Sequence, residues 1–299
     1  MYSRCRKTFD RFAATANRAP RNRAACTDLR GIALFLALAI GCTGALAADR
    51  QLRVCADPDN LPFSHADGTG FENRIAELLA AELKAALTYE WLPQRRGFVR
   101  KTLGAGLCDL IVGVPEGFDP VRTTRPYYRS TFVFAYRADR GHDYVRFDDP
   151  QLARARIGVQ LIGNDLAASP PGHALAQRGL VDNVVGFLVY GDKPQAQRMI
   201  DALGRGDIDV AILWGPQAVY FAREQRLPIA VVPAHAPAEL TQVPFEYSIA
   251  MGVRKGDVEL QNALDVILEK RRADIDAILR DYGVPRTDAP GSQHAEVVR

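Results

Sequence analysis

The stretch Asp109–Arg137, DLIVGVPEGFDPVRTTRPYYRSTFVFAYR, decides the fold class together with Leu52–Ser64, LRVCADPDNLPFS. The first begins as an apolar strand at Leu110–Val114, breaks into a loop rich in Gly and Pro, and resumes as an alternating strand at Thr131–Tyr136. The second is a short strand that stops in Asp-Pro-Asp-Asn-Leu-Pro. Open α/β sheets bind ligands outside the carboxyl ends of their strands, so these two strand ends predict a binding cleft.

Apolar strands alternate with amphipathic helices, such as Phe71–Ala86, along the rest of the chain. This alternation is typical of mainly parallel sheets flanked by helices. Two polar breaks, Arg137–Pro150 and Pro233–Pro244, each adjoin a long strand. We therefore predict an α/β fold of two lobes joined by a two-crossing hinge that opens and closes around a ligand. Lobe 1 would comprise residues 48–138 and 242–283, lobe 2 residues 139–241, and residues 284–299 a disordered tail.

Residues 1–47 have the composition of a secretory signal peptide. Eight Lys/Arg among the first 30 residues precede an apolar core at Gly31–Ile40, and Ala45-Leu46-Ala47 is a small-x-small cleavage signature. An uncleaved anchor is the alternative, because Gly31–Ala48 is an uncharged run of 18 residues. We expect cleavage after Ala47, a periplasmic location and no membrane span in the mature chain.

Removal of the leader reverses the sign of the net charge. The leader carries eight basic and two acidic residues, which leaves 30 basic and 33 acidic residues and a net charge of about −3. The basic balance of the full chain is therefore no argument for nucleic-acid binding.

Two cysteines, Cys55 and Cys108, remain after the leader. An even pair in an exported chain favours a disulfide. However, Cys55 lies near the end of its strand, whereas Cys108 precedes the start of another. If these strands are parallel neighbours, an offset of about four residues, roughly 13 Å, is too long for a bridge. Two separate buried thiols are the alternative, and the sequence leaves both open.

The strings LRVCADPDNLPFS, CDLIVGV, RIGVQ and GDIDVAILWGPQA, in this order, resemble type II periplasmic solute-binding proteins, the bacterial extracellular solute-binding protein family 3. The resemblance covers nearly all of the chain beyond the leader. More narrowly, LRVCADPDNLPFS, WLPQRRGFVRKTLGAGLCD and GVPEGFDPVRTTRPYYRST resemble its MoxJ/XoxJ-like branch. The resemblance implies a two-lobed binding-protein fold and an accessory role toward a periplasmic quinoprotein (PQQ-dependent) alcohol or methanol dehydrogenase.

Departures from the family pattern argue against an ordinary α-amino acid as ligand. Amino-acid binders of this family usually hold the ligand carboxylate with an Arg in the loop after the first quoted strand, and the ligand amine with an Asp after the strand near residue 210. Here the loop arginines, Arg122 and Arg125, do not match the usual spacing, and Trp214 follows the second strand. The acidic residue found two positions after Glu72 in many relatives is Arg74.

Seven residues near strand ends are candidate ligand contacts, each with a structural alternative. The residues after the first strand also form turns on their own, and the arginines can bind an anion or form surface ion pairs. The Tyr can line the cleft or pack in the hinge, and the Trp offers an apolar face with one hydrogen-bond donor. The candidates are Asp57, Asn60, Phe63, Arg122, Arg125, Tyr127 and Trp214.

Four basic residues, Arg95, Arg96, Arg100 and Lys101, surround Phe98. They predict a docking patch for an acidic partner, and a solvated helix face is the alternative.

The sequence contains no nucleophile elbow, phosphate-binding loop, haem-attachment motif or zinc spacing, so we expect no catalysis, no metal and no cofactor. The leading prediction is a non-catalytic accessory protein of a quinoprotein dehydrogenase. The first alternative is the substrate-binding component of an ABC importer, with a small aromatic or anionic solute as ligand. The second is a periplasmic enzyme that uses Glu116 or Glu72 as an acid or base.

Overall fold

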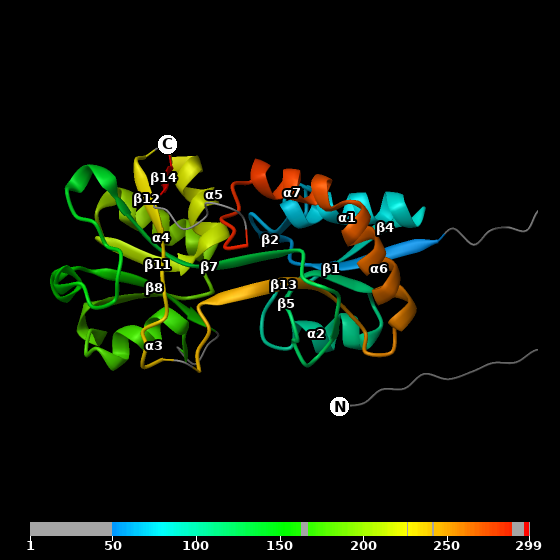
Figure 1. Cartoon of the computed structure of the whole chain (residues 1–299), viewed down its shortest axis with the longest axis horizontal. Helices are drawn as coiled ribbons and strands as arrows, with labels where there is room; N and C mark the ends of the chain where they lie inside the picture. The colour runs from blue at the N-terminus through cyan, green and yellow to red at the C-terminus, as the bar shows by residue number, and fades with distance from the viewer. Residues whose placement is uncertain (1–49, 163–166, 226, 241, 289–295, 299) are drawn as a thin grey trace, which may run out of the picture. The chain divides into compact units, whose positions relative to one another are not determined.

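The computed structural model describes residues 50–162, 167–225, 227–240, 242–288 and 296–298 (Figure 1). The leader prediction lies outside these residues. The main sheet follows the strand order β10-β8-β11-β7-β13-β5-β1-β4. The bounds of these strands are β1 Gln51–Ala56, β4 Ala86–Trp91, β5 Leu110–Pro115, β7 Tyr128–Arg137, β8 Ile157–Ile162, β10 Val184–Phe187, β11 Val210–Trp214 and β13 Glu246–Val253.

The predicted α/β class is confirmed, and most of the predicted strands are parallel. β4 and β5 run parallel to β1, and β10 and β11 run parallel to β8. β7 and β13 are antiparallel to each other and to their other neighbours. Short strands complete the structure: β2 Asp59–Asn60, β3 Ser64–His65, β6 Arg122–Thr123, β9 Ala167–Ala168, β12 Ile229–Pro233 and β14 Glu296–Val298.

The helices bury apolar stripes against the sheet. The predicted helix at residues 71–86 is α1, which ends three residues earlier because Lys84 adopts a left-handed backbone conformation, with a φ of 49°. A membrane-spanning helix is not found among the described residues. The helices are α1 Phe71–Leu83, α2 Phe98–Lys101, α3 Pro170–Gln177, α4 Gln195–Arg205, α5 Gly215–Gln225, α6 Val258–Lys270 and α7 Arg272–Asp281.

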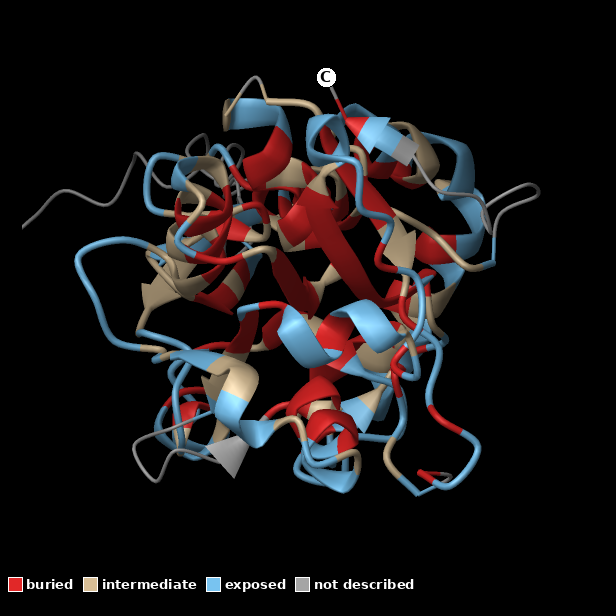
Figure 2. Ribbon diagram, turned by 90° about the vertical axis from the view of Figure 1, so that its left-hand side faces the viewer, coloured by how far each residue is buried: buried red, intermediate tan, exposed pale blue. Residues whose placement is uncertain are grey.

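β7 connects two groups of core residues. Its first residues, from Tyr128 to Thr131, pair with β13, where α1, α6 and α7 cover a core that includes Leu79 and Leu279. Its later residues pair with β11 and β12, and they alternate between two cores on opposite faces. Phe134 faces one and Ala135 the other. Figure 2 shows the buried strands inside and the exposed outer faces of the surrounding helices.

The chain after α7 packs against the fold, which corrects the expectation of a disordered tail for residues 284–288 and 296–298. Val284 is buried, and the Pro285 carbonyl accepts a 2.6 Å hydrogen bond from Ser130 Oγ. Arg286 forms ion pairs with carboxylates on both sides of it in the sequence. β14 then adds an antiparallel strand to β12. The prediction failed because polar composition does not exclude backbone pairing with an available sheet edge.

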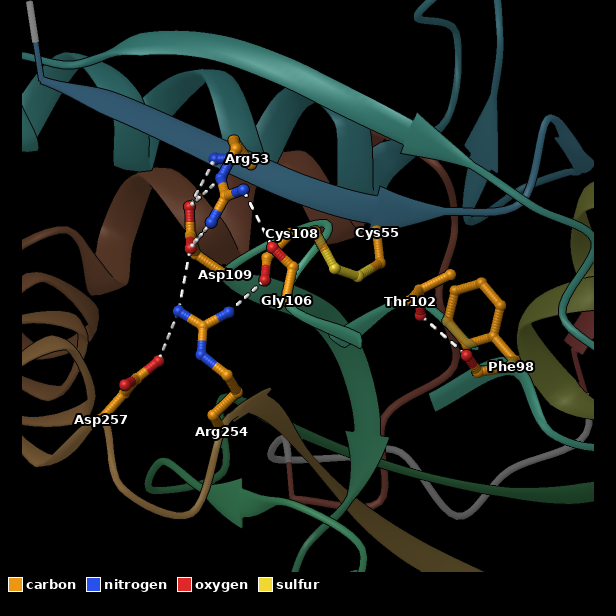
Figure 3. Close-up of a disulfide and its surroundings, with 9 residues drawn as sticks. All are labelled: Arg53, Cys55, Phe98, Thr102, Gly106, Cys108, Asp109, Arg254 and Asp257. Carbon is orange, nitrogen blue, oxygen red and sulfur yellow. Dashed lines mark hydrogen bonds and ion pairs between the residues drawn. A yellow bond between two sulfur atoms is a disulfide. The ribbon is translucent and has the colours of Figure 1, made fainter. Parts of the chain in front are cut away.

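Cys55 and Cys108 form a disulfide, with their Cα atoms 5.5 Å apart (Figure 3). The offset argument against this bond was wrong because it extended β5 backwards as a straight strand. β5 begins at Leu110, and the preceding turn folds Cys108 over β1. Both cysteines are buried beside Phe98 and Ile111.

An ion-pair network lies next to the disulfide (Figure 3). The Asp109 carboxylate accepts three hydrogen bonds from Arg53, two from its guanidinium at 2.6 Å and 3.0 Å and one from its backbone N–H at 3.2 Å, and one from Arg254 at 2.9 Å. Arg254 also pairs with Asp257 at 2.7 Å. Burial alone would raise the pKa of Asp109, but the hydrogen bonds from the two arginines outweigh it and lower the pKa.

We expect the double substitution of Cys55 and Cys108 by serine to reduce the free energy of unfolding by about 2–4 kcal/mol, because the bond restricts the unfolded chain. Urea unfolding measures this loss. The unsubstituted protein in dithiothreitol should show the same loss, whereas the variant should not respond to the reductant. Equal stability of the oxidised and reduced protein would contradict the expectation.

Asp109→Asn is expected to reduce the free energy of unfolding at pH 7 by about 2–4 kcal/mol, because two partly buried guanidinium groups lose their carboxylate. The pKa of Asp109 is lower in the folded state, so its contribution is present above about pH 4 and is lost as pH falls further. The stability difference should therefore shrink in acid. Asp148→Asn, in the exposed pair with Arg146, is the control and should change the stability much less, because solvent screens an exposed ion pair.

Candidate functional site

A polar cavity of about 380 Å³ lies where strand ends meet. One wall is formed by the loops after β1 and β4, and the other by the loop after β10 with the first turns of α4 and α5. This position agrees with the rule that α/β sheets bind ligands beyond the carboxyl ends of their strands. The polar side chains in its lining belong to Asp57, Asp59, Asn60, Gln94, Arg95, Lys193, Gln195 and Gln217.

Asp57 and Asn60, two of the predicted ligand contacts, line this cavity and also hold its first wall in place. The Asp57 carboxylate accepts hydrogen bonds from the backbone N–H of Asp59 at 2.9 Å and of Gln94 at 2.6 Å. The Asn60 amide donates to Gln94 Oε1 at 3.2 Å. Turn formation and cavity lining are therefore combined in the same residues.

The opposite wall is built on glutamines that the sequence prediction missed. Gln160, near the end of β8, donates from Nε2 to Gln195 Oε1 at 3.3 Å and to Gln217 Oε1 at 3.1 Å. Its own Oε1 accepts from the Trp214 backbone N–H at 3.4 Å. Their positions at a strand end and in the first turns of helices were the signal in the sequence that could have identified these glutamines.

Trp214 and Phe63 use their rings mainly in packing. The half-buried Trp214 ring contacts Phe132 and Tyr247, with ring centroids 5.4 Å and 5.8 Å away, and so lies between two cores. The Phe63 ring packs edge-on against Phe71, 5.3 Å between centroids. Neither residue is part of the polar cavity lining, and ligand contact by either one stays a prediction.

Three other residues that were predicted to contact the ligand lie outside the lining of the polar cavity, and each is bound to another group of the chain. Arg122 donates from Nε to the Lys255 carbonyl at 2.9 Å. Arg125 pairs with Glu269 of α6 at 3.0 Å. Tyr127 is 1% exposed and donates to the Val112 carbonyl at 3.1 Å. These contacts favour the structural alternatives that the sequence left open, namely surface contacts for the arginines and packing for Tyr127, and ligand contact by the three residues stays a prediction.

The predicted docking residues Arg95, Arg96, Arg100 and Lys101 are all exposed. No described carboxylate forms an ion pair with any of them, in contrast to Arg125 and Arg74, which pair with acidic side chains. The Arg95 guanidinium lies over the Tyr190 ring at 4.3 Å from its centroid, a cation–π contact at the rim of the polar cavity.

Glu72 is a half-buried acid whose carboxyl group points into the protein. It lies in the first turn of α1, and its carboxyl occupies the space in which a side chain at Gly113 would lie. Burial raises its pKa to about 8, and no described residue forms an ion pair with it. Glu116, the other predicted acid, lies exposed in the loop after β5. No group of three or more His, Cys, Asp or Glu within the described ranges is placed to hold a metal ion.

Comparison with known proteins identifies relatives along nearly the whole chain. The sequence model of the bacterial extracellular solute-binding proteins, family 3, matches residues 52–285. Protein MoxJ of Paracoccus denitrificans is 34% identical over 255 residues, which cover 81% of this chain and 91% of that protein. Protein MoxJ of Methylorubrum extorquens is 30% identical over 295 residues, which cover 89% and 96%.

Solved structures give the same result. The periplasmic binding protein XoxJ from Methylobacterium extorquens AM1 is 39% identical, with a TM-score of 0.66, and the match covers 80% of this chain and all of that one. MxaJ from Methlophaga aminisulfidivorans MPT is 26% identical, with a TM-score of 0.70 and coverage of 79% and 100%. The predicted periplasmic binding protein fold and the resemblance to the MoxJ/XoxJ branch are therefore confirmed.

Glu72→Gln is expected to stabilise the protein by about 1–3 kcal/mol at pH 9 and to change little at pH 4. The folded-state pKa of about 8 exceeds the unfolded value, so the folded protein loses stability as pH rises between them. Thermal or urea unfolding across this pH range measures the effect. Glu77→Gln, at an exposed position on the same helix, is the control. An unchanged pH dependence in Glu72→Gln would contradict the expectation.

Proposed function

From the premise that this chain belongs to the bacterial extracellular solute-binding proteins, family 3, we propose that it is a non-catalytic accessory protein of a periplasmic PQQ-dependent alcohol or methanol dehydrogenase. It docks to the dehydrogenase or assists its maturation. The likeness to two MoxJ proteins and to XoxJ supports placing the chain in this branch of the family. Resemblance to this branch implies such a partner. The leader at residues 1–47 would deliver the chain to the periplasm.

One observation carries the proposal. Some arginines near the strand ends are bound to neighbouring groups, whereas the basic residues between 95 and 101 have no ion-pair partner among the described residues. The loop arginines nearest to the amino-acid binding pattern, Arg122 and Arg125, are bound to neighbouring groups. Arg74, at the usual acidic position, pairs with Asp281 at 3.4 Å. The cations between residues 95 and 101 instead remain exposed, on a chain whose net charge without the leader is about −3. This arrangement fits docking of an acidic protein surface better than capture of an amino acid.

Two lobes, residues 48–138 with 242–283 and residues 139–241, form part of the same proposal. β7 and β13 are the long strands at the proposed lobe boundaries, and they pair over four residues of each. The Arg95–Tyr190 contact joins one proposed lobe to the other and would favour a closed arrangement.

The polar cavity favours one second candidate, the substrate-binding component of an ABC importer. Carboxylates, amides, Lys193 and Arg95 line a cavity of about 380 Å³, a volume in the range of small-molecule sites. The ligand would then be a small polar or anionic solute, because the lining offers charged and amide groups and Trp214 packs elsewhere.

Residues 48–299 mixed with the periplasmic PQQ-dependent dehydrogenase of the same organism should form a complex in native mass spectrometry and titration calorimetry. Its affinity is expected to fall at least about tenfold between low salt and about 0.3 M salt, because exposed charges are screened. The double variant Arg96→Glu and Arg100→Glu should weaken binding by a similar factor. Arg154→Glu, an exposed cation outside the patch, is the matched control.

A small molecule that copurifies with the protein, together with no complex at either salt concentration, would overturn the accessory role and support the importer. A complex that is insensitive both to salt and to the double variant would move the interface away from the basic residues.

A further inference from the structure

A second cavity, larger and more apolar than the polar one, lies under the basic residues. It encloses about 520 Å³ between the stretch 94–104 and the loop after β5. Phe98, Ile111 and Val114 are buried and form its floor. Arg95, Arg96 and Arg100 belong to its lining, which contains no acidic residue.

The floor of this cavity is held rigidly. Phe98 and Ile111 belong to the same core cluster as the disulfide cysteines. The Phe98 carbonyl accepts a buried 2.8 Å hydrogen bond from Thr102 Oγ1, which fixes the turn below the arginines (Figure 3). A preformed cavity binds with little loss of conformational freedom. The opposite rim carries Phe118, a large apolar side chain that is 37% exposed.

Positive charge and apolar surface therefore occur together at this cavity. Three guanidinium groups without a described carboxylate partner lie around an apolar hollow. Glu116 and Asp119, the acids of the neighbouring loop, do not line the cavity, and Asp119 pairs with Lys255 at 3.4 Å. A group that fits this site has an apolar body and negative charge on both sides of it.

We propose that this cavity receives one large apolar side chain, flanked by carboxylates, from an acidic segment of the partner protein. The proposal rests on the accessory function and specifies its interface. The flanking carboxylates pair with Arg96 and Arg100, and the apolar side chain enters between Phe98 and Phe118. Such an anchor in a preformed pocket is the usual energetic centre of a protein interface.

The distribution of charge favours a chain segment over a small molecule. Lys101 is exposed and continues the basic stretch beyond the cavity lining. A small ligand is mostly enclosed by its site, whereas these cations extend along the surface past the hollow. A peptide longer than the cavity can contact all of them at once.

The test uses residues 48–299 and blocked synthetic peptides, with binding measured by fluorescence anisotropy at low salt. Asp-Glu-Phe-Asp-Glu is expected to bind, and Asp-Glu-Ser-Asp-Glu to bind about tenfold or more weakly, because burial of the Phe side chain is lost. Lys-Lys-Phe-Lys-Lys should not bind. Arg96→Glu with Arg100→Glu should weaken the Phe peptide about tenfold, and Arg154→Glu should leave it unchanged.

Val99→Trp fills the cavity and should abolish the difference between the Phe and Ser peptides while charge-driven binding persists. If this variant does not fold, Phe118→Ser, at the exposed rim, should reduce the same difference. Equal binding of the Phe and Ser peptides, or no binding of the Phe peptide, overturns the proposal. Benzoate that binds more tightly than the Phe peptide assigns the cavity to small aromatic anions instead.

The peptide assay contains no dehydrogenase, so its failure is separable from failure of the accessory function. A dehydrogenase complex that survives unchanged in Val99→Trp would overturn the cavity proposal and leave the proposed function intact.

Discussion

The antiparallel pairing of β7 with β13 is the constraint on which the rest of the structure depends. The four paired residues from Tyr128 to Thr131 join the half of the main sheet that carries β1 and β5 to the half that carries β8 and β11. Thr131 strengthens this junction with a buried 2.9 Å hydrogen bond to the Phe245 carbonyl. Because strands on both sides are aligned through this pair, their ends face common space, and the polar cavity forms there.

The periodicity of the sequence was sufficient to predict the fold class, but it could not predict side-chain partners distant in sequence. β7 alternates between two cores, so its pattern identifies it as a buried strand. Arg125 looked free because its partners on α6 lie about 140 residues further along the chain. The disulfide was left open because strand register does not describe the turn before β5. Gln160 gave little signal because an uncharged amide at a strand end is common.

The two candidate surfaces differ in how far their polar and charged side chains already have partners within the chain. Around the polar cavity, Asp57 already accepts a hydrogen bond from the Gln94 backbone N–H, and Gln195 accepts one from Gln160, so a ligand there must compete with existing hydrogen bonds. Around the apolar cavity, Arg96 and Arg100 have no described carboxylate partner, and a partner would gain their charge without displacing another group. The free cations therefore make the second surface the better candidate for macromolecular contact.

The disulfide has a consequence for when the proposed basic docking surface can bind a partner. The bond links β1 to the chain just before β5 and lies in the same cluster as Phe98, from which the basic residues extend. Such a bond forms in oxidising compartments and not in the reducing cytosol. Under the proposed function, a newly made chain therefore lacks the covalent support of the proposed recognition surface until after export. In the proposed function, the disulfide therefore forms in the same compartment in which the chain would meet its partner protein.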